Sequence, residues 1–264
     1  MSATRPRIAL VTGATGAIGE AIALSIALTP GFEVVLACRD ENKGRRTAAR
    51  IADATGSAHP RVEAVDLSRS ASVAALARRF DGPLHVLVNN AAETPPRRRE
   101  TADGLEVQLA TNVLGYFWMI TELREALERG APSRIVNVAS YWAGGLDLTD
   151  LQFVRRPYDN DSAYRQSKQA DRMLTVAFAE RLAPAGISVN ACHPGDVSSA
   201  LSHSLGFGGH ETPAQGAETP AWLATSDEIT GVTGRYFEHR REKACSFGAD
   251  RDAVERLYQI CQEA

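Results

Sequence analysis

Tyr164 and Lys168 have the side-chain types and the spacing that most directly suggest chemistry in this sequence. They lie four residues apart in SAYRQSKQADRML, a segment of helical period, so a helix would present both on one face. An ammonium beside a phenol favours the phenolate and lowers the pKa of the tyrosine toward the range used for proton transfer. Ser140, which ends the apolar run RIVNVAS, adds a hydroxyl. These three residues are candidate catalytic groups, although such a tyrosine–lysine pair alone is most often a coincidence of a helix surface.

A glycine-rich stretch, TGATGAIG at 12–19, stands between the apolar run RIALV and the Ala/Ile-rich stretch EAIALSIAL. Glycine permits a tight turn and a close backbone approach, and a following helix N-terminus offers free N–H groups and a positive dipole end. This position, after a first strand and before a first helix, is that of a dinucleotide-binding fingerprint. Alone it is weak evidence, because any strand-to-helix connection can need glycine. The candidate diphosphate-binding residues are Gly13, Thr15, Gly16, Ala17, Ile18 and Gly19.

The residues about 20 positions beyond the glycines bear on the choice of nicotinamide cofactor. An NAD enzyme would place an acidic residue at the end of the second strand, against the ribose 2′-hydroxyl. This sequence has Cys38 there, followed by Arg39, whose guanidinium suits a 2′-phosphate. Asp40 keeps NAD(H) open as the alternative, because a boundary shift of two residues would make it the ribose ligand. We predict NADP(H), with a merely solvated Arg39 as the other interpretation.

An alternation of strands and helices would position these candidates. Apolar runs rich in β-branched residues, typical of strands covered on both faces, alternate with longer stretches of helical period. We expect strands at 7–12, 32–38, 61–67, 85–91, 134–140, 187–193 and 234–239. We expect helices near 18–28, 40–54, 70–79, 103–129 and 162–183. This pattern predicts an α/β protein, a single-domain Rossmann fold whose doubly wound parallel sheet has about seven strands and binds ligands beyond their carboxyl ends.

Two irregular stretches, 141–161 and 198–220, follow strand carboxyl ends and are expected to be substrate loops within the single domain 1–264. Their larger apolar side chains could line a pocket for a hydrophobic or aromatic carbonyl compound, or could equally pack their own loops. Those side chains are Tyr141, Trp142, Leu146, Phe153, Leu201, Leu205 and Phe207. The Ala- and Arg-rich composition is also compatible with a ketoreductase of secondary metabolism.

Composition excludes several other classes of function. The formal charge of −3, with 23% charged residues, describes an ordinary globular protein with no basic surface for nucleic acid. The 4 cysteines form no CxxC pair and the 6 histidines have no ligand spacing, so we expect neither a disulfide framework nor a metal site. Scattered thiols fit a reducing cytoplasm. The start MSATRPR has no signal-peptide core and no spanning segment follows, so we expect no membrane attachment.

Taken together, the motifs resemble those of the short-chain dehydrogenases/reductases over essentially the full length of the chain. The matching stretches are TGATGAIG, VDLS at 65–68, NNAA at 89–92, TNVLGYF at 111–117, YRQSK at 164–168 and HPGDVSS at 193–199. Within that family the chain is most similar to the retinol-dehydrogenase-type branch, through TADGLEVQLATNVLGYF, DLTDLQF and GVTGRYF. The resemblance implies an NADP(H)-dependent enzyme that interconverts a carbonyl and an alcohol of a small-molecule substrate. It also leaves a homodimer or homotetramer open, through helices matching 103–129 and 162–183.

The resemblance further implies a role for each matched residue. Tyr164 would donate a proton during reduction and accept one during oxidation, while Lys168 would lower its pKa and bind the nicotinamide ribose. Ser140 would orient and polarise the substrate oxygen, and Asn112 would complete a water-linked proton relay with Lys168. The remaining implied cofactor contacts are Asp66 and Leu67 at the adenine, Asn89 and Ala91 in the cleft, and Pro194, Gly195, Val197 and Ser199 around the nicotinamide.

Two departures from the pattern leave alternatives open. Single-domain members place the middle glycine at the position of Ala17, whereas the spacing TGxxGxxG here is similar to that of two-domain epimerases and dehydratases. Only about 70 residues follow HPG, so we interpret Gly16 and Ala17 as a local swap in which the methyl of Ala17 crowds the diphosphate. Glu93, after NNAA, either adds a charge near the cofactor or faces solvent. A nucleotide sensor that has lost its chemistry remains the non-enzymatic alternative.

Overall fold

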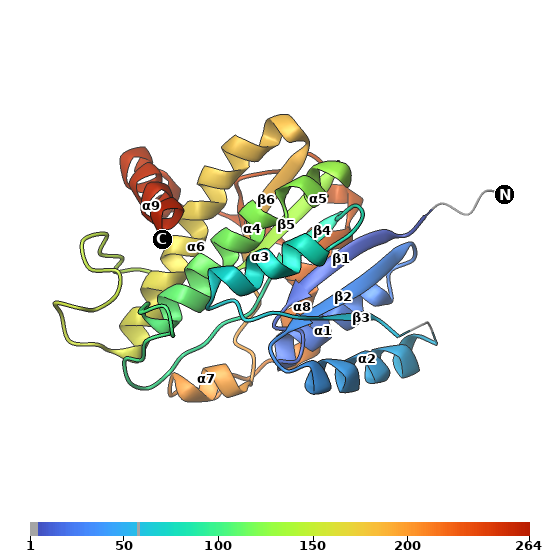
Figure 1. The fold of residues 1–264 in the computed structure, drawn as a ribbon, viewed down its shortest axis with the longest axis horizontal. Coiled ribbons are helices and arrows are strands. Elements are labelled where there is room, and N and C mark those ends of the chain that lie inside the picture. Colours follow the sequence, from blue (N-terminus) through green and yellow to red (C-terminus); the bar gives the residue numbers. More distant parts are fainter. Residues whose placement is uncertain (1–4, 57–58) are drawn as a thin grey trace.

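The computed structural model describes residues 5–56 and 59–264, which form one sheet between two layers of helices (Figure 1). The sheet has 8 strands in the order β3-β2-β1-β4-β5-β6-β7-β8. The strands are β1 (Arg7–Thr12), β2 (Phe32–Cys38), β3 (Arg61–Ala64), β4 (Val86–Asn89), β5 (Ser133–Val138), β6 (Ile187–His193), β7 (Tyr236–Glu238) and β8 (Arg241–Lys243). All neighbours pair in parallel except β7 and β8. The predicted single-domain, doubly wound Rossmann fold is confirmed.

The eighth strand is the one that the sequence analysis missed. β8 returns antiparallel to β7 through His239 and Arg240, both of which have positive φ angles. Its three residues, REK, are all exposed and charged. A strand of this kind has no apolar run from which it could be predicted, so seven strands were expected instead of eight.

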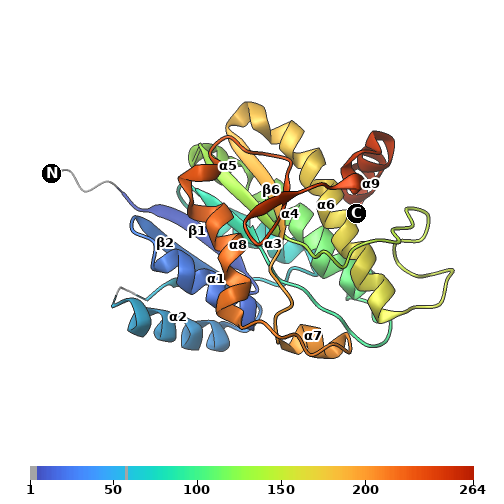
Figure 2. The same ribbon diagram turned by 180° about the vertical axis from the view of Figure 1, so that it is seen from behind.

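The helices divide between the two faces of the sheet. They are α1 (Ala17–Ala27), α2 (Glu41–Thr55), α3 (Ser70–Arg79), α4 (Gly115–Glu122), α5 (Arg124–Arg129), α6 (Asn160–Leu182), α7 (Ala200–Ser204), α8 (Pro213–Thr225) and α9 (Arg251–Glu263). Helices α3, α4 and α6 cover one face, and α9 packs on α6 (Figure 1). Helices α1, α2 and α8 cover the other face (Figure 2).

Three helical regions differ from expectation. The helix expected over 103–129 is interrupted, because a π-helical turn, η1 (Leu109–Leu114), precedes α4 and a break at Leu123 separates α4 from α5. The stretch 198–220, expected to be irregular, contains α7 and most of α8. Thr212 and Gln215 cap α8 reciprocally and Pro213 occupies its first turn, signals that the Gly- and Pro-rich composition concealed. Helix α9, capped by Asp250, was not predicted at all.

The parallel register brings the ends of β1 and β4 together at the point where strand order reverses, which is where such sheets bind ligands. The hydroxyl of Thr12, at the end of β1, accepts hydrogen bonds from the backbone amides of Asn90 (2.8 Å) and Ala91 (3.2 Å). The two loops that must hold a cofactor are therefore fixed to one another.

The residues after β6 complete this same domain. They form α7, α8, β7, β8 and α9, so the described residues contain no second domain of the kind that an epimerase or dehydratase of the two-domain type requires. None of the helices in the described ranges is both long and apolar enough to cross a bilayer. The first four residues of the chain, on which part of the expectation about targeting rested, lie outside the described ranges.

Candidate active site and cofactor cleft

A cleft of about 500 Å³ opens at the carboxyl ends of β1, β2 and β4. Most of the predicted cofactor-binding residues line it: Gly13, Thr15, Gly16, Ala17, Ile18, Gly19, Arg39, Asp66, Leu67, Ala91 and Ser199. Other residues of the lining were not among the predicted cofactor contacts, among them Lys43, Asn90, Thr111, Ala200 and Leu201. The glycine loop, the end of β2 and the loop after β4 therefore meet at one site.

Two of the three glycines are required by close packing. A Cβ on Gly13, whose φ angle is 63°, would lie 2.8 Å from the Cα of Ala91, and a Cβ on Gly19 would lie 2.3 Å from the carbonyl oxygen of Gly13. Gly16 is different, because a Cβ there would meet nothing nearer than 3.4 Å. Gly16 precedes the first turn of α1 and makes no side-chain cap, so the first N–H groups of this helix remain available to an anion. The loop fits a dinucleotide diphosphate.

Arg39 and Asp40, at the end of β2, make different side-chain contacts. The side chain of Arg39 is 63% exposed, lines the cleft and forms an ion pair with Glu93. Asp40 also lines the cleft, but its carboxylate caps α2 by accepting a hydrogen bond from the amide of Lys43 at 3.0 Å. Glu93 faces the cleft rather than open solvent, which brings a negative charge to the residue predicted to read the 2′-phosphate.

Tyr164 and Ser140 meet beside the carboxyl end of β5, and both are more than nine-tenths buried. The Ser140 oxygen accepts a hydrogen bond from the amide of Trp142 at 3.0 Å. Burial raises the pKa of Tyr164, whereas the charge of Lys168 and the neighbouring hydroxyl of Ser140 lower it. Burial prevails, so the pKa lies above its ordinary value. Lys168 thus acts on this pKa in the predicted direction, but its effect is smaller than that of burial.

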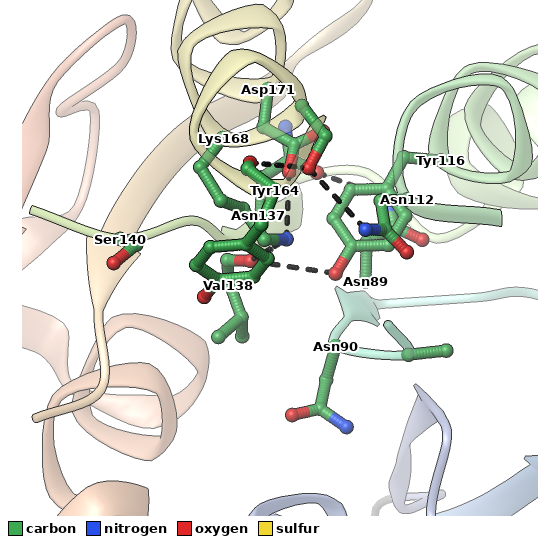
Figure 3. Close-up of polar contacts among 12 residues, drawn as sticks. Asn89, Asn90, Asn112, Tyr116, Asn137, Val138, Ser140, Tyr164, Lys168 and Asp171 are labelled. Carbon is green, nitrogen blue, oxygen red and sulfur yellow. Dashed lines mark hydrogen bonds and ion pairs between the residues drawn. The ribbon is translucent and has the colours of Figure 1, made fainter. Parts of the chain in front are cut away.

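Lys168 lies one helical turn after Tyr164 and is fully buried (Figure 3). Its Nζ donates to the carbonyl oxygen of Val138 at 3.0 Å and to Oδ2 of Asp171 at 2.9 Å. Burial alone would lower the pKa of Lys168, but the charge of Asp171 holds it above its ordinary value. Asp171 was not among the predicted site residues, although its spacing from Lys168 along a helix could have identified it.

Asn112 links the cofactor loop to the catalytic helix (Figure 3). Its Oδ1 accepts from the amide of Glu93 at 2.8 Å, while its Nδ2 donates to the carbonyl oxygen of Glu93 at 3.1 Å and to Oγ of Ser167 at 3.3 Å. Ser167 lies on α6 between Tyr164 and Lys168. Asn112 is in the π-helical turn η1, a distortion that recurs at functional sites. Its predicted water-linked contact with Lys168 stays a prediction.

Several predicted cofactor contacts lie outside the lining of the cleft. Asn89 is fully buried and donates to Oδ1 of Asn137 at 3.0 Å, while its neighbour Asn90 lines the cleft in its place. Successive residues of a strand point to opposite faces, so an error of one position selects the wrong asparagine. The other predicted contacts that do not line the cleft are Tyr164, Lys168, Pro194, Gly195 and Val197.

The loop after β6 is held in place by Glu211. Its carboxylate accepts a hydrogen bond from the amide of Asp196, and its backbone pairs with Val197. A Cβ on Gly195, whose φ angle is 118°, would lie 2.1 Å from this carboxylate. The loop therefore has one defined course from β6 to α7, where Ser199 and its neighbours close the cleft.

The apolar side chains of the expected substrate loops separate into two groups. Phe153 is buried, and Leu146 packs against the core, so both support their own loop. Tyr141, Trp142 and Phe207 remain exposed. Trp142 stacks on Phe207 with ring centroids 6.4 Å apart, and the ring of Tyr141 lies edge-on to that of His193. An exposed aromatic surface thus adjoins Ser140.

The fold and this arrangement define an oxidoreductase of the short-chain dehydrogenase/reductase family, to which the chain belongs. A profile of the family described as short chain dehydrogenase matches residues 7–206. The protein is of the retinol-dehydrogenase type: it is 36% identical to mouse retinol dehydrogenase 13, over 94% of this chain and 80% of that protein. The predicted family and branch are confirmed.

Solved structures of the family show the same fold with either nicotinamide cofactor. The 3-ketoacyl-(acyl-carrier-protein) reductase from Brucella melitensis, solved with NADH, superposes with a TM-score of 0.68 and 28% identity, covering 89% of this chain and 97% of that one. The Pseudomonas aeruginosa RhlG/NADP active-site complex superposes with a TM-score of 0.69 and 26% identity, covering 88% of this chain and 94% of that one. A nicotinamide cofactor is thereby supported for this chain, without a choice between the two.

Proposed function

We propose that the protein is an NADP(H)-dependent oxidoreductase that interconverts a carbonyl and an alcohol, with Tyr164 as the general acid and base. The observation that carries the proposal is the buried group of Tyr164, Ser140 and Lys168, whose Nζ lies 5.9 Å from the Tyr164 ring, at the sheet edge that also holds the glycine loop. The bound cofactor supplies or accepts the hydride. The glycine loop and the N-terminus of α1 would hold its diphosphate, and Arg39 would hold the 2′-phosphate.

The side chains of the site have distinct tasks in this reaction. Ser140 donates to or accepts from the substrate oxygen and orients it toward Tyr164. Tyr164 gives its proton to that oxygen in reduction and removes it in oxidation. Lys168, anchored by Val138 and Asp171, supplies a fixed positive charge next to the phenol. Asn112 holds the Glu93 loop against α6 and so keeps the cofactor cleft in register with the proton donor.

The preference for NADP(H) rests on charge at the adenine end of the cleft. Arg39 and Lys43 both line it, and the carboxylate of Asp40 is engaged in capping α2. The exposed ring system of Tyr141, Trp142 and Phe207 supports a hydrophobic or aromatic substrate, which includes the ketones of secondary metabolism. We further propose a reducing, cytoplasmic location, which suits four cysteines that are all unpaired.

The test is the oxidation of NADPH and of NADH in the presence of aromatic, steroidal, retinoid and polyketide-like ketones and aldehydes. We expect turnover with a subset of these compounds and a preference for NADPH. Replacing Tyr164→Phe should lower turnover by about 100-fold or more while NADPH still binds, because only the proton donor is lost. Tyr258→Phe, in α9, is the matched control and should leave turnover unchanged. Full activity in Tyr164→Phe would remove this phenol from the mechanism.

Two further outcomes distinguish the alternatives. Arg39→Asp should move the preference from NADPH toward NADH. Arg45→Asp on α2 is the control and should leave the preference unchanged. An unaltered preference in Arg39→Asp would mean that this residue does not bind the 2′-phosphate. Tight NADPH binding with no turnover of any compound would favour the nucleotide-sensor alternative.

A further inference from the structure

Asp171 and Lys168 form an ion pair that is sealed from solvent within α6 (Figure 3). The distance from Nζ to Oδ2 is 2.9 Å, and the two side chains are 2% and 0% exposed. Placing two charges at such depth carries a desolvation cost that their attraction does not always repay. In the proposed reaction the carboxylate of Asp171 anchors Lys168, a task that would not by itself require a negative charge.

The carboxylate is only partly satisfied by its surroundings. Oδ2 accepts from Lys168, but Oδ1 has no hydrogen-bond partner in the described part of the chain. An amide at this position would be easier to bury than a carboxylate, since it carries no charge. A role in the electrostatics of the site would explain why a charged group stands here.

Asp171 also fixes the head group of Lys168. The ammonium has three donors, and two of them are committed to Asp171 and to the carbonyl oxygen of Val138. A single donor is left to face Tyr164 or a bound ribose. The Nζ atom lies 5.1 Å from the ring centroid of Tyr116 and 5.9 Å from that of Tyr164, so its charge and that of Asp171 act on the same phenol.

The other titratable groups around Asp171 are neutral at neutral pH. Tyr116 on α4, Cys192 on β6 and Cys261 on α9 face this cluster from three other elements. Burial raises the pKa of Cys261 to about 12, with a further contribution from Asp171, and burial also raises the pKa of Tyr116 and of Cys192 well above their usual ranges. Of the charges on the other side of Tyr164, Asp196 acts in the same direction as Asp171. The effect of the positive charge of Lys168 on Tyr164 is therefore partly offset by the negative charges of Asp171 and Asp196.

We propose that Asp171 is a positioning residue that offsets the charge of Lys168, so that Tyr164 keeps its proton at neutral pH and the site is set for carbonyl reduction. This inference rests on the proposed function, in which Tyr164 exchanges a proton with the substrate oxygen. Reduction needs the phenol and oxidation needs the phenolate, so a counter-charge next to Lys168 favours one direction over the other. Without Asp171, the ammonium would act unopposed and would favour the phenolate.

The decisive variant is Asp171→Asn, which removes the charge and keeps nearly the same shape. Tyr164 is titrated by NMR in protein labelled with carbon-13 at the tyrosine Cζ and saturated with NADP⁺, and its resonance is assigned by its loss in Tyr164→Phe. We expect the titration midpoint of Tyr164 to fall by about one pH unit in Asp171→Asn. A midpoint that is unchanged or higher would overturn the proposal.

Turnover gives a second readout, with the carbonyl compound that reacts fastest and with its alcohol. Reduction is lost as the pH rises past the titration of Tyr164, and oxidation appears there. The pH at which reduction is lost and the pH at which oxidation appears should therefore both fall by about one unit in Asp171→Asn. A change of rate without a shift of these two pH values would show that Asp171 only supports the structure, and would overturn the proposal.

If Asp171→Asn does not fold, the wild-type titration decides, because the proposal requires Tyr164 to stay protonated to about pH 9 in the NADP⁺ complex; a midpoint near neutrality overturns it. Glu106→Gln is the control and should leave the titration midpoint of Tyr164 unchanged. Glu106 is as buried as Asp171 but is not among the charges acting on Tyr164. Failure of the proposed function appears separately, as absent turnover, whatever the titration shows.

Discussion

The guanidinium of Arg39 pairs with the carboxylate of Glu93 across the cofactor cleft, joining the loop after β2 to the loop after β4. Both side chains line the site in which a 2′-phosphate would have to contact Arg39. The negative charge of Glu93 therefore competes with that phosphate for the same guanidinium. A 2′-phosphate bound to Arg39 would have to break or loosen this ion pair.

Glu93→Gln should tighten the binding of NADPH by about two- to fivefold, because it releases Arg39 and removes a repulsive charge. The effect is modest because Arg39 is 63% exposed and solvent screens the pair. NADH, which has no 2′-phosphate, should gain much less. Fluorescence titration of both cofactors measures the two dissociation constants.

Glu41→Gln is the control for this substitution. Glu41 pairs with Arg45 on the exposed face of α2 and does not line the cleft, so its loss should leave NADPH binding unchanged. An equal gain for NADPH and NADH in Glu93→Gln, or no gain for either, would mean that Glu93 does not compete with the 2′-phosphate.

Ala17→Gly should increase the affinity for NADPH by about fivefold or more, because it removes a methyl from the first residue of α1, where the diphosphate must approach. The same change should cost about 0.5–1 kcal/mol of stability, since glycine weakens a helix. Calorimetric titration gives the affinity and urea denaturation gives the stability.

The complementary substitution Gly16→Ala should have little effect on folding. Gly16 has a φ angle of −86°, which any residue adopts, and its Cβ would meet nothing nearer than 3.4 Å. If Ala17→Gly binds NADPH no better than the wild type, the displaced glycine of this loop is a neutral variation and the methyl does not crowd the cofactor.

Local spacing made the centre of the site predictable from sequence. Tyr164 and Lys168 share a helix face because they are four residues apart, and the glycine loop follows directly from its place between β1 and α1. Asp171 could have been included by the same rule. The pair of Arg39 and Glu93 could not, since 54 positions separate them and only the order of β2, β1 and β4 brings their loops together.

Register and capping account for the remaining differences. Asn89 and Asn90 are adjacent, and only the exact end of β4 decides which of them faces the cleft. Helix α8 was hidden because it contains Gly216 and Pro220 in its interior, although Thr212 and Pro213 mark its start. Its position matters for the site, since the loop that leads into it carries Glu211, which holds the segment after β6.

The stability of the protein should fall in acid through His193. This side chain is more than nine-tenths buried, and its Nδ1 has no hydrogen-bond partner within the described ranges. Burial lowers the pKa of His193 from 6.5 to about 4. Between these two values the unfolded chain binds a proton that the folded chain does not, so stability is complete above about pH 6.5 and declines below it, by about 3 kcal/mol at pH 4.

His193→Gln should remove this part of the pH dependence. Urea denaturation at about pH 7 and about pH 4.5 would show a smaller loss of unfolding free energy in the variant than in the wild type. His210→Gln, at an exposed position, should retain the wild-type dependence. If His193→Gln and the wild type lose stability equally on acidification, His193 is not the group that titrates.

We expect helix α9 to keep the protein monomeric, because it covers the surface that the family resemblance assigns to an interface between copies. The rings of Phe117 on α4, Phe178 on α6 and Tyr258 on α9 pack with centroids 5.1 to 5.3 Å apart, so α9 covers parts of both helices that the family resemblance assigns to the interface. Light scattering should give the mass of one chain, 28.4 kDa.

The packing of α9 can be tested directly at Leu257, which is fully buried against this surface. Leu257→Ala should cost about 2–5 kcal/mol of unfolding free energy and loosen α9, whereas Gln259→Ala on the exposed side should change it by about 0.5 kcal/mol or less. If α9 is what blocks association, Leu257→Ala should also raise the fraction of dimer with increasing concentration, since it uncovers apolar side chains of α4 and α6. A wild-type dimer in which Phe117 and Phe178 are protected by a second chain would contradict this account.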